Sequence, residues 1–138
     1  MTEKEKALAG LEFICGGKEL RQQRDAAEAL CFQLNNTPPA DAEAREEILR
    51  QLLPDRGEGC YIKSPFICEY GTYIKVGKNF FANYNCKLVD GGQITFGDNE
   101  HILCKALILW VCNFITDHPC NQHSHDGRFP AAGTKLGT

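Results

Sequence analysis

The sequence contains no hydrophobic run long enough to cross a membrane. Its longest apolar stretch, residues 106–115, is interrupted by Asn113 and has about half the length that a bilayer-spanning helix needs. The first residues, MTEKEK, are followed by a polar segment rather than by the apolar core of a secretory signal peptide. We therefore expect a soluble, cytoplasmic protein without a membrane partner.

The chain also lacks a large excess of charge of either sign. Its formal net charge is −3 at pH 7, and the charged residues do not form blocks of one sign. This balance excludes an extended nucleic-acid-binding surface. With 138 residues, of which 43% are hydrophobic and 24% are charged, the chain can form a globular domain with a buried core.

None of the eight cysteines is spaced from another as CxxC. The missing spacing excludes zinc ribbons and thioredoxin-like redox motifs. In a chain expected to stay in a reducing compartment, we interpret most of these cysteines as small buried hydrophobic residues.

The first part of the chain, up to Pro54, has the pattern of helices. A helix is predicted over Lys18–Asn35, because its apolar residues fall near one face and its charged residues lie opposite. Two prolines follow and end this helix, since proline cannot donate a helical hydrogen bond. Asp41 is a candidate N-cap for a second helix over Ala42–Leu53.

Between Gly57 and Asn99, apolar residues recur at a spacing of six. One series comprises Ile62, Cys68, Ile74, Phe80 and Cys86, and a second comprises Val76, Ala82, Leu88 and Ile94. Neither the helical period of 3.6 nor simple alternation explains both series. A hexapeptide period is typical of a β-helix, in which short strands contribute inward residues to stacks.

The hexapeptide IKVGKN at residues 74–79 recurs as ITFGDN at residues 94–99. Its Gly-x-Asn corner suits a tight turn with positive φ. The offset of twenty residues is three hexapeptides plus two, which predicts a small loop at residues 90–92.

Beyond Asn99 the pattern changes. Glu100 stands where the next apolar residue is expected, and Ile102, Ile108 and Phe114 restore a spacing of six in a register shifted by two. This series is either a further coil with a bulge or a coincidence within an apolar run. The polar, Gly-rich residues 120–138 are expected to be poorly ordered.

Several phrases resemble the maltose and galactoside O-acetyltransferase family. They are TEKEK and LAG near the start, LNNTPP after the first long helix, IKVGKNFFANYN in the hexapeptide region, and GDN at residues 97–99, where the resemblance ends. FFANYN within a hexapeptide array is the most specific of them. The family carries further coils after these phrases, so the chain is interpreted as C-terminally truncated or divergent after Asn99.

The resemblance implies an α+β fold that assembles as a homotrimer. Residues 1–55 would form a helical N-terminal cap domain, and residues 56–99 a short left-handed parallel β-helix of hexapeptide repeats. Residues 100–138 would form a divergent, partly disordered tail.

The resemblance also implies transfer of an acetyl group from acetyl-CoA, as co-substrate, to a hydroxyl of a sugar or related acceptor, without a metal. His118, within Thr-Asp-His-Pro, would be the general base, and Asn83, Asp90 and Glu69 would bind the acceptor. Imidazole titrates near neutrality and can take a hydroxyl proton, while amide and carboxylate groups can orient several hydroxyls. Asn83 and Asp90 could instead be only turn residues. No residue is indicated for acetyl-CoA.

Two other functions stay open at this point. The chain could be an inactive, truncated remnant that serves only as an assembly or interaction module, because unpaired coils expose apolar ladders. Its tail could alternatively bind a metal, since zinc needs only four Cys or His ligands. The candidate ligands are His101, Cys104, Cys112, His118, Cys120, His123 and His125.

Overall fold

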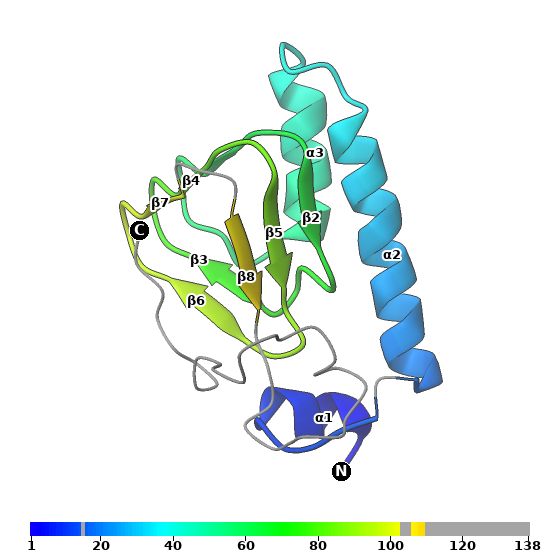
Figure 1. The fold of residues 1–138 in the computed structure, drawn as a ribbon. Helices are drawn as coiled ribbons and strands as arrows, with labels where there is room; N and C mark the ends of the chain where they lie inside the picture. The colour runs from blue at the N-terminus through cyan, green and yellow to red at the C-terminus, as the bar shows by residue number, and fades with distance from the viewer. Residues whose placement is uncertain (15, 103–105, 110–138) are drawn as a thin grey trace.

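Three helices precede a set of short parallel strands (Figure 1). The computed structural model describes residues 1–14 and 16–102, and the backbone of residues 106–109. The helices are α1 (Glu3–Leu8), α2 (Lys18–Asn35) and α3 (Ala42–Leu52). The two longer helices confirm the predicted ones, and α2 and α3 lie side by side along one flank of the strands. No helix in the described part of the chain is long and apolar enough to cross a membrane.

The strands form three narrow parallel sheets. They are β1 (Tyr61–Ile62), β2 (Phe66–Cys68), β3 (Ile74–Val76), β4 (Phe81–Ala82), β5 (Cys86–Val89), β6 (Ile94–Phe96), β7 (His101–Ile102) and β8 (Ala106–Leu109). The sheet orders are β1-β4-β7, β2-β5-β8 and β3-β6. The chain therefore visits three faces in turn, and each circuit, called a coil below, lies on the previous one. The predicted order of helices followed by parallel hexapeptide strands is confirmed.

Residues that stack inside the coils are twenty positions apart. Ile62 pairs with Ala82, and Ala82 pairs with Ile102. All three side chains are buried. Residues six apart, which gave the signal in the sequence, instead occupy neighbouring faces of one coil. The two extra residues in each circuit explain the offset between residues 74 and 94.

Parallel pairing continues past Asn99, where the sequence prediction ended the coils. β7 pairs with β4, and β8 pairs with β5 over residues 106–109. The shift of two at Ile102 is therefore the same two-residue addition that separates the earlier coils. Phe114, the last member of that series, lies outside the described residues.

Asparagines form the tight corners between faces. Asn79, Asn85 and Asn99 adopt φ values of 56°, 62° and 58°. The values at Asn79 and Asn99 confirm the positive φ predicted for the two Gly-x-Asn corners. The amide of Asn79 also donates to Oδ1 of Asn99 at 3.0 Å. Gly77 is needed for a different reason, because a Cβ there would lie 2.6 Å from the carbonyl carbon of Gly97 in the next coil.

The helices and the segment that follows α3 cover the open edge of the first coil on all three faces. On β2, the side-chain amide of Asn35 donates to the Phe66 carbonyl and accepts from the Phe66 N–H, both at 2.9 Å. On β1, Nη2 of Arg45 donates to the Ile62 carbonyl at 2.8 Å. On β3, Val76 forms a parallel bridge with Arg56. These contacts satisfy backbone groups that a preceding coil would otherwise have to bind.

We expect Asn35→Ala to destabilise the protein by about 1–3 kcal/mol, because it leaves the Phe66 N–H and C=O without their partners. Gln33→Ala is the matched control, since Gln33 is exposed on the same helix. It should change the free energy of unfolding by less than about 0.5 kcal/mol. Urea denaturation measures both, and equal effects would contradict a capping role for Asn35.

Candidate functional site

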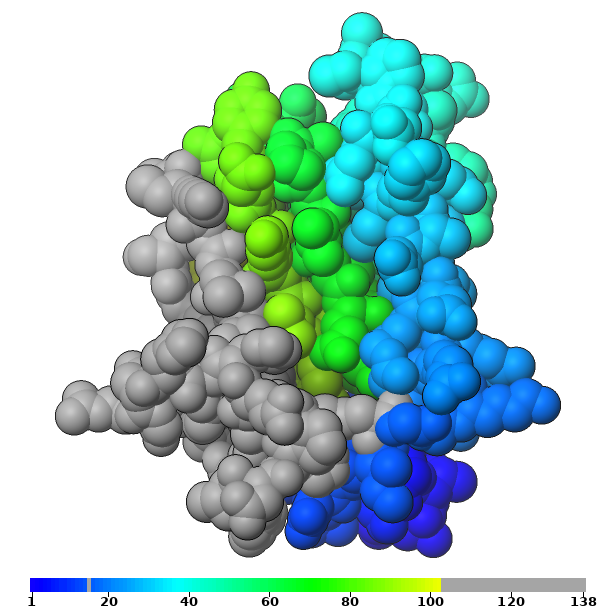
Figure 2. All heavy atoms as spheres, turned by 45° about the vertical axis from the view of Figure 1, so that its right-hand side comes forward, coloured from blue at the N-terminus to red at the C-terminus, as the bar shows by residue number. Residues whose placement is uncertain are grey.

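A groove of about 590 Å³ runs between α2 and the β2–β5 sheet. Its lining combines charged, amide, thiol and apolar side chains. They are Arg24, Glu28, Cys31, Phe32, Asn35, Ile67, Cys68, Glu69 and Val89. Figure 2 shows this face, with α2 in blue and cyan beside the green atoms of the coil. Among the predicted site residues, Glu69 lies in this groove.

The register of α2 against β2 determines which side chains meet in the groove. Four helical residues rise about 6 Å, and two strand residues rise about 6.6 Å. Once Asn35 is paired with Phe66, Cys31 therefore faces Cys68 two strand residues further on. Arg24 then reaches the end of the strand, where its Nη1 donates to the Tyr70 hydroxyl at 2.9 Å.

Glu69 and Arg24 give this end of the groove its electrostatic character. Burial raises the pKa of Glu69, and the positive charge of Arg24 lowers it in part. Burial also raises the pKa of Tyr70, so its hydroxyl stays protonated near neutral pH. Glu69 offers a carboxyl group and Arg24 a guanidinium at this end of the groove, while the buried Tyr70 hydroxyl, which is not part of the lining, accepts from Arg24. A carboxyl group beside a guanidinium suits a ligand carrying several hydroxyls.

Asp90 holds the backbone of the loop that carries Glu69. Its Oδ1 accepts from the N–H groups of Glu69 at 3.0 Å and Tyr70 at 2.9 Å, and its Oδ2 accepts from Gly71 at 2.8 Å. The side chain is 0% exposed. Burial raises the pKa of Asp90 to about 7, although the backbone donors work in the opposite direction. These contacts are those of a residue that organises a turn, one of the two roles that the sequence left open.

The loop that Asp90 holds leaves no room for a side chain at Gly71. This residue adopts a φ of +78°, and a Cβ there would lie 2.1 Å from the Leu52 carbonyl oxygen. The end of α3 therefore packs directly against the loop. Glu69 is fixed from both sides, by Asp90 within the coil and by the helical cap outside it.

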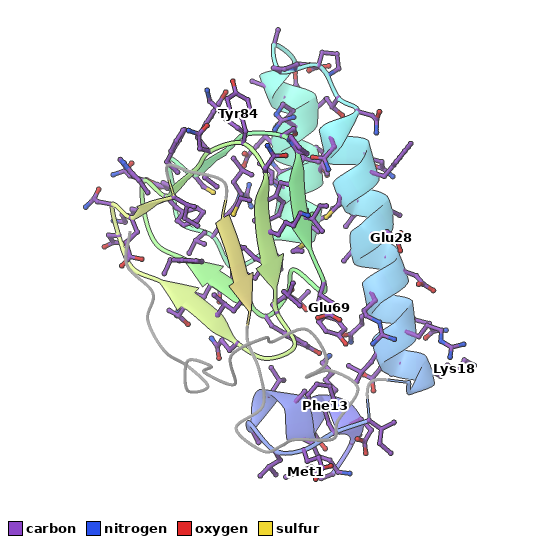
Figure 3. All side chains as sticks on the ribbon, in the orientation of Figure 1. Met1, Phe13, Lys18, Glu28, Glu69 and Tyr84 are labelled. Carbon is purple, nitrogen blue, oxygen red and sulfur yellow. The ribbon has the colours of Figure 1, made fainter. Side chains whose placement is uncertain are left out.

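Asn83 lies at a different corner of the coil. It precedes β5, whereas Asp90 follows β5, so a strand about 13 Å long separates them. Its Oδ1 accepts from the N–H of Tyr84 at 2.9 Å. Figure 3 shows Tyr84 and Glu69 at opposite ends of the strands. One chain therefore brings Glu69 and Asp90 together and keeps Asn83 apart from them.

His118, the predicted general base, lies outside the described residues. All the predicted tail ligands except His101 also lie outside them. The His101 ring packs edge-on against the Phe81 ring, with 5.8 Å between the ring centroids. Within residues 1–14 and 16–102, the structure contains no group of three Cys, His, Asp or Glu side chains that could hold a metal ion.

Arg24 and Glu28 were missed by the sequence interpretation, which placed the charged residues of α2 opposite its apolar face and named none of them as site residues. Their spacing of four places them on one side of the helix, and that spacing was the available signal. It does not reveal that β2 and its loop lie opposite.

Comparisons with known proteins all lead to one family. Residues 6–57 match the maltose acetyltransferase hexapeptide capping motif. The chain is 32% identical over 130 residues to the galactoside O-acetyltransferase of Escherichia coli (strain K12), covering 94% of this chain and 63% of that protein. Across the curated relatives compared, the chain spans between 48% and 65% of their length.

Solved structures give the same result. A maltose O-acetyltransferase from Clostridium difficile 630 is 40% identical with a TM-score of 0.71, covering 73% of this chain and 54% of that chain. A hexapeptide-repeat acetyltransferase from Vibrio cholerae O1 biovar eltor, complexed with acetyl coenzyme A, is 33% identical with a TM-score of 0.67. That match covers 74% of this chain and 55% of the Vibrio chain.

Asp90→Asn tests the buried carboxyl group. The folded-state pKa of about 7 exceeds the unfolded value of 3.8, so the folded protein binds this proton more tightly. The contribution is fully present below pH 3.8, and the free energy of unfolding should fall as pH rises from about 4 to 7. We expect wild type to lose up to about 4 kcal/mol relative to Asp90→Asn over that range. Urea denaturation at several pH values measures this, and parallel pH profiles would contradict it.

Proposed function

The chain belongs to the maltose/galactoside O-acetyltransferase family, and from this membership we propose that it transfers an acetyl group from acetyl-CoA to a hydroxyl of a sugar or related acceptor. The observation that carries the acceptor class is the groove between α2 and β2, where Glu69 and Arg24 present hydrogen-bonding groups. Sugars are recognised by such convergent polar groups beside apolar walls. Glu28 and Phe32 extend the groove with one further carboxylate and one exposed aromatic ring.

The proposed reaction needs one base and an electrophilic thioester. The acceptor oxygen forms a bond to the acetyl carbonyl carbon while His118 removes the hydroxyl proton. The carbon–sulfur bond then breaks, and the proton passes to the departing sulfur of coenzyme A. Histidine suits both transfers because its pKa lies near neutrality.

We assign different roles to the three acceptor-site residues. Glu69 would contact the acceptor directly from the groove, and Asp90 would position Glu69 through the loop backbone. Asn83, at the far end of β5, would reach an acceptor only if another copy of the chain brought its corner close. This separation supports our proposal that the protein acts as a homotrimer, with acceptor sites between subunits.

The finer description of the fold belongs to the same proposal. We propose that the three-faced coil winds as a left-handed β-helix. Residues 1–55 are proposed as the cap domain, residues 56–99 as the hexapeptide coils and residues 100–138 as a divergent tail. The pairing of β7 and β8 with the coils indicates that the first part of this tail extends the β-helix.

Glu69→Ala and Asn83→Ala should each lower kcat/KM for the sugar acceptor by about tenfold or more, because each removes a hydrogen bond to a hydroxyl. Glu43→Gln is the control, since Glu43 is exposed at the start of α3, away from the groove. Steady-state kinetics with a panel of maltose-like and galactoside-like acceptors measures the effect. An unchanged kcat/KM in both variants would remove these residues from the acceptor site.

His118→Ala should reduce kcat by roughly 10²–10⁴, the usual contribution of a general base. The release of coenzyme A thiol from acetyl-CoA, followed with a thiol reagent, measures the rate. Wild-type turnover that equals the variant's would exclude His118 as the base. No acetyl transfer by the wild-type chain to any acceptor would favour an interaction module instead.

A further inference from the structure

Two cysteines from different parts of the chain face each other in the groove. Cys31 lies on α2 and Cys68 ends β2, and their sulfur atoms are 3.8 Å apart. Each side chain is 5% exposed, yet both line the groove. A small solute that enters the groove can therefore reach the two sulfur atoms, although both residues are otherwise buried.

The fixed register of α2 brings these sulfur atoms together. Asn35 pairs with Phe66 on one side of the cysteines, and Arg24 bonds Tyr70 on the other. A disulfide requires the sulfurs to approach to about 2.05 Å, a movement of less than about 2 Å. Because the two flanking contacts hold helix and strand side by side, side-chain rotation and a small backbone shift can supply most of this movement.

The contact between the two thiols suits stepwise oxidation. Either sulfur can donate its proton to the other, so the contact favours ionisation of one thiol while the other keeps its proton. The ionised thiol of the pair is the nucleophile, and the protonated one lies within reach to resolve the product. Burial raises the pKa of both Cys60 and Cys86 to about 11, so these described cysteines stay protonated and less reactive.

We propose that Cys31 and Cys68 form a redox site that small hydroperoxides oxidise to a reversible disulfide, linking the helical cap to the coil across the groove. The thiolate of the pair attacks one peroxide oxygen, the O–O bond breaks, and a sulfenic acid forms. The leaving oxygen takes up the proton that the thiol gave up and departs as water from hydrogen peroxide, or as an alcohol from an organic hydroperoxide. The second thiol then attacks the sulfenic acid sulfur, the S–O bond breaks, and the leaving hydroxyl takes up the proton of the second thiol and departs as water. The two thiols lose two electrons, and the hydroperoxide gains them.

The disulfide would link two residues that are 37 positions apart in the sequence. Closing a loop of that size restricts the unfolded chain and stabilises the folded one. The disulfide also fixes the wall of the groove directly beside Glu69. The redox site does not depend on acetyl transfer, so its test and the kinetic tests above can fail separately.

The test uses the full chain, reduced, then exposed to hydrogen peroxide at a few molar equivalents. Remaining thiols are alkylated, and the protein is digested without reductant and mapped by mass spectrometry. We expect a peptide pair joined through Cys31 and Cys68 as the main product, which disappears after dithiothreitol treatment. Over-oxidation of the two thiols without a link, or predominant links to other cysteines, would overturn the inference.

Two variants separate a specific site from general oxidation. Cys31→Ser should abolish the linked peptide, and Cys60→Ser, which removes a half-buried cysteine outside the groove, should retain it. Oxidation should raise the urea midpoint of wild type and Cys60→Ser but leave Cys31→Ser unchanged. A midpoint that rises equally in Cys31→Ser, or in none of the three proteins, would contradict the predicted disulfide. The peptide map of the wild-type chain decides the matter if a variant does not fold.

Discussion

The hydrogen-bonded pair between the Asn35 side chain and the Phe66 backbone is the contact on which the described structure depends. A side-chain amide carries one donor and one acceptor, so it can replace the neighbouring strand that β2 lacks on its outer side. It also fixes the position of α2 along the strand to within one residue. A shift of one helical residue would rotate Cys31 and Arg24 by about 100° away from Cys68 and Tyr70, and the groove would lose its polar end. Capping the coil and building the groove are therefore consequences of the same contact.

Arg45 covers the outer edge of β1 with a buried charged group. Arg45 is 9% exposed, and its guanidinium donates to the Leu34 and Ile62 carbonyls at 3.0 and 2.8 Å and to the Ser64 hydroxyl at 3.2 Å. A buried charge is tolerated only when its donors are satisfied, and here neutral oxygens from α2 and from β1 and its loop do so. The planar fork suits this task better than an ammonium group, since it bonds two backbone carbonyls at once. Helix, loop and strand are tied together at a point where a purely apolar contact would leave carbonyl groups unpaired.

Much of the fold could be predicted from the sequence because its signals are local. Two prolines and one apolar face define α2, and the hexapeptide period identifies the coil. The handedness of the coil, the position of His118 in space and the acceptor-binding roles stay predictions. The groove itself could not be predicted, because it depends on how a helix lies against a strand 31 residues away. Arg24 and Cys31 look like ordinary exposed and buried residues of an amphipathic helix until that register is known.

Asp90 illustrates why a family resemblance and a structure can assign different tasks to one residue. The Asp90 side chain is 0% exposed and its two oxygens accept three backbone N–H groups, which are the contacts of a residue that holds a loop. The loop backbone that it holds carries Glu69 into the groove, so in the proposed acceptor site Asp90 would act through Glu69. The rigidity of that loop then comes from inside the coil, and the partner groups Arg24 and Glu28 come from the cap. A site built in this way requires both parts to be folded and correctly aligned, so the helical segment is a component of the site as well as a cover for the first coil.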